Sequence, residues 1–250
     1  MLRLILIFVL LALPAHSEEV VAGLSQNRVS ITANFDGSEI LIFGAVKREA
    51  PVPEGRLDVI ITVEGPEQTV TVRRKERILG LWINKDAVDI VAAPSFYAVA
   101  SSGDLAETVS LVADLENAIS VHNAVGVVNL PPDVRDSASF SQALIRIRGE
   151  ADLYQQLENA VEVTDDTLFQ TRIALPSNLV EGDYATRIFL ARGGEIIADY
   201  ETGIDVRKVG LERFLFNLSR QRPLIYGLLS LAIAIAAGWG ASAVFRLIRT

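Results

Sequence analysis

Sulfur is almost absent from the sequence, which contains no cysteine and a single methionine, Met1. Without cysteine the chain forms no disulfide, has no thiol nucleophile and lacks the thiolate ligands of most structural zinc sites. Two explanations stay open. Either chance and the tendency of exported proteins to avoid lone thiols suffice, or the protein works in an oxidising or sulfur-reactive environment that damages Met and Cys.

Histidine is nearly as scarce, since only His16 and His122 are present. A Ser-His-Asp triad or a zinc site would need His122, which follows a predicted helix and precedes Gly126 in a predicted solvated loop. Carboxylate pairs such as Asp165-Asp166 are typical of turns and helix caps, and no run of oxygen ligands around a glycine turn indicates calcium. The sequence therefore predicts no enzyme, no cofactor and no bound metal.

Positive charge is in deficit as well. The chain has 23 basic and 31 acidic residues, a net charge of −8, which becomes −9 without the first 17 residues. A surface this acidic repels phosphates, so nucleic acid is not a predicted partner.

The first 17 residues have the pattern of a secretory signal peptide. Arg3 precedes the apolar run 4–13, and the small-x-small triplet Ala15-His16-Ser17 follows it. The run is too short to span a bilayer, which favours cleavage after Ser17 over a retained anchor. We therefore predict export, with Glu18 as the first residue of the mature chain.

The C-terminal region has the pattern of a transmembrane helix. Residues 224–245 contain no charge, and at about 1.5 Å per residue they span a hydrocarbon core of ~30 Å. A signal peptide followed by one stop-transfer segment places residues 18–222 outside the cytoplasm and 246–250 inside. Residues 208–223 are predicted to form an interfacial helix or an extension of the membrane span.

Between these ends, alternating β-branched residues predict short strands separated by turn signals such as Asp36-Gly37 and Gly193-Gly194. One predicted strand is 78–83. The stretch from Leu175-Pro176 to Gly182-Asp183-Tyr184 fits the corner tyrosine of an immunoglobulin-like sandwich, whose hydroxyl bonds back to the preceding loop. We expect a mainly β, antiparallel immunoglobulin-like sandwich over residues 18–207, with one C-terminal transmembrane helix.

Helical spacing interrupts the strands in the middle of the chain. Apolar residues recur at helical positions over Asp104–Ile119 and again over Phe140–Leu157, with Gly149 as a breaker. This predicts a helical insertion at about 103–157. Two β subdomains joined by helices are the alternative.

A basic cluster stands out in the acidic domain: Arg73, Arg74, Lys75 and Arg77, with Trp82 a few residues on. One interpretation is a solvated hairpin tip that discourages edge-to-edge pairing. The other is an anion-binding or docking site, because guanidinium groups match oxyanions in two-pronged hydrogen bonds. For Trp82 the alternative is core packing.

The predicted membrane helix carries two rows of small residues with a spacing of four. One row is Ala232, Ala236 and Gly240, and the other is Ala234, Gly238 and Ser242. Small residues at this spacing let helix backbones approach closely, which predicts a packing partner in the membrane. The alternative is that Ala and Gly are simply frequent in membrane helices.

Several short blocks carry a likeness to a known family. In the first half they are Phe35-x-Gly37, Phe43-Gly44-Ala45, Val72-Arg73-Arg74-Lys75, Trp82-Ile83-Asn84 and the run from Pro94 to Ser101. In the second half they are Ala143-Leu144-Ile145-Arg146, Leu153-Tyr154, the stretch Leu175-Pro176 to Tyr184, Tyr226-Gly227-Leu228 and Gly238-Trp239. With these blocks the chain resembles, over nearly all of its mature length, the alphaproteobacterial transmembrane protein family Alph_Pro_TM.

The resemblance implies a single-pass protein of a Gram-negative inner membrane with its domain in the periplasm, and a multi-span transporter of the sulfite-exporter (TauE/SafE) type as a neighbour. We expect a non-enzymatic accessory protein, a subunit of an exporter of small sulfur oxyanions. The alternative is a periplasmic module that binds an anion or other ligand independently of any transporter.

Overall fold

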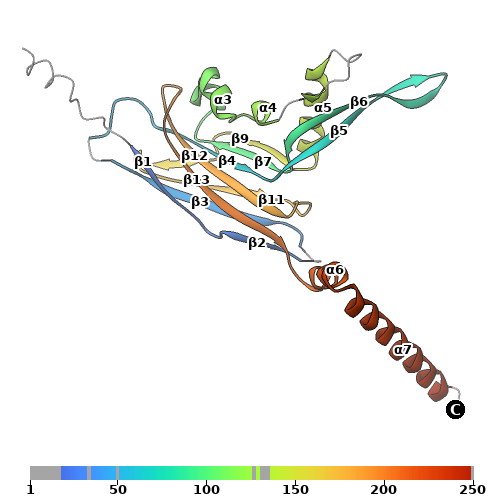
Figure 1. The fold of residues 1–250 in the computed structure, drawn as a ribbon. Coiled ribbons are helices and arrows are strands. Elements are labelled where there is room, and N and C mark those ends of the chain that lie inside the picture. Colours follow the sequence, from blue (N-terminus) through green and yellow to red (C-terminus); the bar gives the residue numbers. More distant parts are fainter. Residues whose placement is uncertain (1–17, 33–34, 49–50, 126–127, 130–135, 249–250) are drawn as a thin grey trace, which may run out of the picture. The chain divides into compact units, whose positions relative to one another are not determined.

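The computed structural model describes residues 18–32, 35–48, 51–125, 128–129 and 136–248 (Figure 1). The chain forms two compact units. The larger comprises Met1–Val29 and Asp36–Val206, and the smaller comprises Ser30–Phe35 and Arg207–Thr250. The predicted signal peptide lies outside the described residues.

The first sheet of the larger unit has four antiparallel strands in the order β1-β3-β11-β10. Their bounds are Glu19–Leu24 for β1, Ser38–Lys47 for β3, Glu162–Thr164 for β10 and Leu168–Leu175 for β11. Every second side chain of β11 is buried, from Phe169 to Leu175. This alternation is the pattern of a strand with one face in a core and the other in water.

The second sheet has six strands in the order β2-β13-β12-β4-β7-β9. Their bounds are β2 Arg28–Ile31, β4 Asp58–Glu64, β7 Tyr97–Ser101, β9 Tyr154–Leu157, β12 Gly182–Arg192 and β13 Glu195–Lys208. Strands β4 and β7 are buried along almost their whole length. They need cover on both faces, which the first sheet and the chain between β7 and β9 provide (Figure 1).

Strands from before and after the insertion pair directly in both sheets, β3 with β11 and β4 with β12. The larger unit therefore combines strands from both sides of the insertion in the same two sheets, and the predicted domain bounds stay a prediction. Its predicted tyrosine corner is confirmed at the bond level. The Tyr184 hydroxyl donates to the Val180 carbonyl at 2.8 Å. The mainly β class is confirmed, and the immunoglobulin-like label stays a prediction.

Between β7 and β9, the described residues form four short helices and strand β8. Their bounds are α2 Leu105–Thr108, α3 Leu111–Asn117, α4 Val121–Ala124, β8 Val128–Asn129 and α5 Ser137–Glu150. Each helix begins at a side-chain cap that accepts a backbone N–H, and these caps are Asp104, Ser110, Ser120 and Asp136. Successive caps restart the helix, so the chain changes direction within a few residues.

Two details of this insertion differ from the sequence expectation. The helical pattern over Asp104–Ile119 is split after Thr108, and Val112 and Leu115 are exposed on α3 instead of buried. The helices end at Glu150, because Tyr154–Leu157 returns to the sheet as β9. It pairs parallel with β7 and so satisfies the backbone of that strand.

A long hairpin, the ribbon, is formed by β5 (Glu67–Ile78) and β6 (Leu81–Pro94), and β6 also pairs with β8. Its turn consists of Leu79 and Gly80, both with positive φ. In Figure 1 the ribbon extends well beyond the insertion helices.

The smaller unit contains α6 (Leu211–Gln221) and α7 (Pro223–Ile248). The two helices are separate because Arg222 has an extended φ and the next residue is Pro223. Proline suits the first position of a helix and not its interior. Residues Pro223–Ser242 form the one helix in the described part of the chain that is long and apolar enough to cross a membrane. The predicted C-terminal apolar helix is thus confirmed, and its helical backbone continues to Ile248, past the predicted end at 245.

Candidate functional site

Strand alternation divides the basic cluster between the two faces of the ribbon. Arg74 lies on the face that meets α5. Its guanidinium is 2.7 Å from the carboxylate of Asp86 and 3.8 Å from that of Asp136, and its Cζ lies 4.9 Å from the centre of the Phe140 ring. Two carboxylates and an aromatic ring therefore already contact Arg74, and we assign this side chain a structural role.

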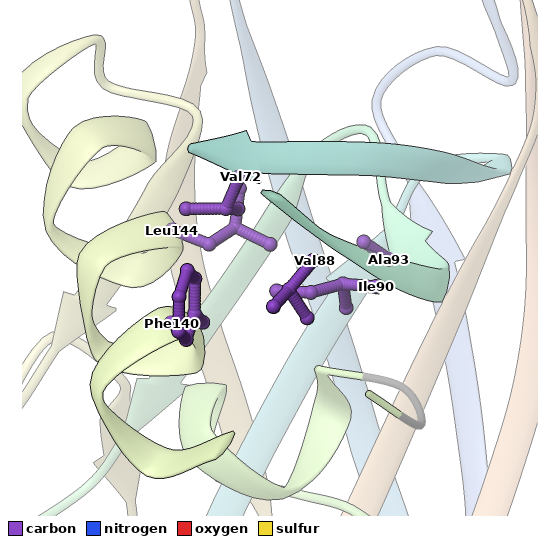
Figure 2. Close-up of a cluster of buried hydrophobic side chains, with 6 residues drawn as sticks. All are labelled: Val72, Val88, Ile90, Ala93, Phe140 and Leu144. Atoms are coloured by element: carbon purple, nitrogen blue, oxygen red, sulfur yellow. The ribbon is translucent and has the colours of Figure 1, made fainter. Parts of the chain in front are cut away.

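A buried apolar cluster lies at the base of the ribbon, beside Arg74. It consists of Val72, Val88, Ile90, Ala93, Phe140 and Leu144 (Figure 2). The first four side chains come from the ribbon and the last two from α5. This cluster packs helix α5 against the base of the ribbon.

Arg73, Lys75 and Arg77 share the opposite face of β5, at intervals of two residues, or about 7 Å. All three are exposed, and the described part of the chain offers none of them an ion pair. Trp82 is paired in register with Arg77 and is 68% exposed, which excludes core packing for it. The structure therefore brings Arg73, Lys75, Arg77 and Trp82 together and separates Arg74 from them.

Sequence reasoning missed the shape of the segment just beyond these cations. Residues 78–83 were expected to form one strand, but the chain reverses at Leu79-Gly80. The signal that could have revealed this is Gly80 in the middle of an apolar run that has strand alternation on both sides. The consequence is an exposed apolar tip at the end of the ribbon.

The small residues of the membrane helix lie on two separate faces of α7. At about 100° per residue, Ala232, Ala236 and Gly240 form one stripe, and the row starting at Ala234 lies on the other side of the helix. A Cβ built on Gly238 or Gly240 meets no atom within 4 Å. Both stripes are therefore open to a neighbouring helix, although nothing in the described chain packs on them.

Two polar side chains of the second sheet, Tyr97 and Arg187, bond to the backbone of the insertion. The Tyr97 hydroxyl donates to the Ile119 carbonyl at 2.7 Å, and Arg187 donates to the Asn117 carbonyl at 2.8 Å. Burial raises the pKa of Tyr97 and that of Glu64, and the Arg187 guanidinium opposes the rise at both. These groups hold the end of α3 on the sheet, so their perturbed pKa values have a structural cause.

The most buried ion-pair network, the Glu18 clamp, consists of Glu18, Arg48 and Arg192. Glu18 Oε1 lies 2.5 Å from Arg48 Nε, and its Oε2 lies 2.9 Å from Arg192 Nη1. Burial raises the pKa of the Glu18 carboxyl, but hydrogen bonds and charge attraction from Arg192 and Arg48 outweigh it and leave the pKa below its ordinary value. The clamp ties the start of the described chain to β12.

Metal chemistry finds no support within the described ranges, where no group of three or more His, Cys, Asp or Glu side chains could hold an ion. His122 is exposed and lies in the short helix α4, not in the predicted loop.

Among the described residues, one apolar, exposed helix follows a mainly β domain, which is the pattern of a membrane protein with a C-terminal span. The family model described as "Putative transmembrane protein (Alph_Pro_TM)" matches residues 19–247. The chain belongs to this family, as the resemblance predicted. No curated protein matches it.

Proposed function

We propose that this protein is a non-enzymatic accessory subunit of the inner membrane, with its sandwich in the periplasm beside a multi-span membrane protein. The observation that carries the proposal is α7, a membrane helix with two stripes of small residues open to a neighbour. Lipid tails are as apolar as leucine, so helices associate in bilayers through close backbone packing, which such stripes permit. We infer a partner of the sulfite-exporter type from the family resemblance.

Orientation can be tested with protease. Added to spheroplasts, it is expected to digest residues 18–222 and to leave α7 with its short tail protected, because one span allows only one end to be accessible. Immunoblotting with tags at either end follows the fragments. Protection of the sandwich in intact spheroplasts would contradict the periplasmic placement.

The partner can be tested by bulk at the stripes. Ala236→Leu and Gly240→Leu keep the span apolar but separate packed backbones, and overpacking of a close contact costs about 1–3 kcal/mol. We expect co-purification of a multi-span protein in mild detergent to fall about tenfold, with normal membrane insertion.

Ala237→Leu is the matched control, because Ala237 lies between the two stripes and receives the same added side chain. Equal recovery of the partner with Ala236→Leu, Gly240→Leu and Ala237→Leu would reduce the helix to an anchor.

A second candidate function is an independent anion-binding module. The observation in its favour is that Arg73, Lys75 and Arg77 share one exposed face without a carboxylate partner among the described residues. This candidate would be supported if the protein binds sulfite and the triple variant Arg73→Gln, Lys75→Gln, Arg77→Gln does not.

A further inference from the structure

The turn of the ribbon is surrounded by large apolar side chains that contact little of the protein. Ile78 is 44% exposed, Leu79 99%, Leu81 71%, Trp82 68% and Ile83 44%. We call these five residues the ribbon tip. Exposed apolar residues are ordinary when scattered singly, whereas a contiguous group marks a surface that meets something apolar.

The turn itself gives no reason for leucine. Leu79 and Gly80 have φ values of 50° and 86°, the signs of a type I′ hairpin turn, which favours Asn, Asp or Gly at both positions. Leucine is unfavourable at positive φ, and a side chain that is 99% exposed gains almost no packing in return. The apolar character of Leu79 therefore serves a contact outside the chain.

The apolar side chains point in all directions around the axis of the ribbon. Register places Ile78, Leu81 and Ile83 on the face of Arg74, whereas Trp82 lies on the opposite face and Leu79 at the apex. A groove on a partner protein would cover one face of a hairpin. A medium that surrounds the tip on every side would cover all five residues.

The ribbon also changes from apolar to positively charged along its length. Arg77 is in register with Trp82, and Lys75 and Arg73 follow behind the tip on the same face. Lys85 forms an ion pair with Glu76, which is in register with Ile83. Residues 73–85 have five cations and one carboxylate, a charge of +4, in a chain of net charge −8, so the remainder carries −12. From the apex backwards, the ribbon presents apolar side chains, then Trp82 and Arg77 at one level, and then Lys75 and Arg73. A bilayer has the same polarity order, from acyl chains through the interface to the phosphates.

We propose that the ribbon tip inserts into the interface of a bilayer that contains anionic phospholipids, with Arg77 at the level of the phosphates and Lys75 and Arg73 behind it, facing the anionic surface. The outward N–H and C=O groups of a two-stranded ribbon are unpaired, so insertion stays shallow, about 5–10 Å. A bilayer is always close, because the same chain belongs to a family of transmembrane proteins and contains its own apolar span. This contact is independent of the proposed partner of α7.

Trp82 provides a direct test, because the chain has only one other tryptophan, Trp239. Full-length protein with Trp239→Phe is reconstituted in vesicles of phosphatidylcholine alone or mixed with phosphatidylglycerol. The lipids of these vesicles carry either plain or brominated acyl chains. In a second arrangement, plain vesicles that contain the protein are mixed with protein-free vesicles of the same phosphatidylglycerol content, either plain or brominated, so that contact with a second bilayer is also detected. We expect a blue-shifted Trp82 emission that brominated acyl chains quench, more strongly with phosphatidylglycerol.

Two variants separate the apolar and the electrostatic contributions. Leu79→Asp is expected to lower the quenched fraction about tenfold or more, since it replaces the leucine that would enter the bilayer with a charged side chain. The triple variant Arg73→Gln, Lys75→Gln, Arg77→Gln is expected to remove the preference for phosphatidylglycerol. Its affinity for vesicles that contain phosphatidylglycerol should fall on the order of a hundredfold at low salt. Leu111→Asp is the matched control, because Leu111 on α3 is 73% exposed, and it should change nothing.

Four outcomes of the vesicle experiments would overturn the proposal. The first is that brominated lipid leaves the Trp82 emission unchanged in both arrangements, and the second is that wild type and Leu79→Asp are quenched equally. The third is that Leu79→Asp and Leu111→Asp lose the same amount of quenching. The fourth is that the emission shifts only after another membrane protein is added. Sodium sulfite or phosphate at matched ionic strength is expected to leave the emission unchanged. A shift caused by either free anion without lipid would assign the cations to a small-anion site and also contradict bilayer insertion.

Discussion

Replacing Glu18 by glutamine is expected to lower the free energy of unfolding of the sandwich by about 2–4 kcal/mol. The side chains of Glu18, Arg48 and Arg192 are only 7%, 9% and 15% exposed. Removal of the carboxylate charge leaves two guanidinium groups poorly hydrated and unpaired, and breaking a buried ion pair costs more than the pair itself contributes. Urea denaturation of the full-length protein in mild detergent, followed by near-ultraviolet circular dichroism, measures the loss.

The effect of this substitution depends on pH in a defined direction. The pKa of Glu18 is lowered in the folded state from its ordinary value of 4.5. Its stabilising contribution is therefore fully present above about pH 4.5 and is lost as the pH falls through the lower folded pKa. The difference between wild type and Glu18→Gln is expected to be constant near neutrality and to shrink below pH 4.5.

Glu19→Gln is the matched control for this experiment. Glu19 pairs with Lys47 at 2.9 Å, but both side chains are about 60% exposed, and such pairs contribute between about 0 and 1 kcal/mol. If Glu18→Gln costs no more than Glu19→Gln, the clamp does not stabilise the fold.

Leu144→Ala is expected to cost about 2–5 kcal/mol. Leu144 is 3% exposed and belongs to the cluster that joins α5 to the ribbon, where truncation removes apolar contacts and leaves a cavity (Figure 2). Urea denaturation gives the total loss, and hydrogen exchange is expected to locate it, with faster exchange in α5, β5 and β6 than in β4 and β12.

Ile147→Ala on the same helix controls for helix propensity, because Ile147 is 51% exposed and has an isomeric side chain. It should change stability by less than about 1 kcal/mol. Similar losses for Ile147→Ala and Leu144→Ala would mean that the cluster does not fix the helix to the ribbon.

The sequence predicted correctly those features that depend on residues close together in the chain. The alternation of β11, the bond from Tyr184 back to Val180 and the apolar helix from Pro223 all follow from periodicity, turn chemistry or length. Each of these signals is contained within about 25 residues of sequence, and each element buries or exposes the side chains that its pattern indicates.

The features that sequence reasoning missed depend on pairing across long separations. Tyr154–Leu157 reads as the end of a helix, but the unpaired edge of β7 recruits it into the sheet. The basic cluster reads as one patch, but strand alternation and the carboxylate of Asp86 set Arg74 apart from Arg73 and Arg77. Neither the edge of β7 nor the position of Asp86 can be read from the residues near those segments.

The position of strand β13 has a mechanical consequence, because the chain continues from this strand to the apolar helix α7. It lies inside its sheet, between β12 and β2, and its pairing with β12 runs from Glu195 to Val206. Tension applied along this strand loads the transverse hydrogen bonds in shear, so they share the force instead of opening one after another. The sandwich is therefore attached through a strand that is paired on both sides, and we expect it to withstand pulling along that strand for longer than its equilibrium stability alone would indicate.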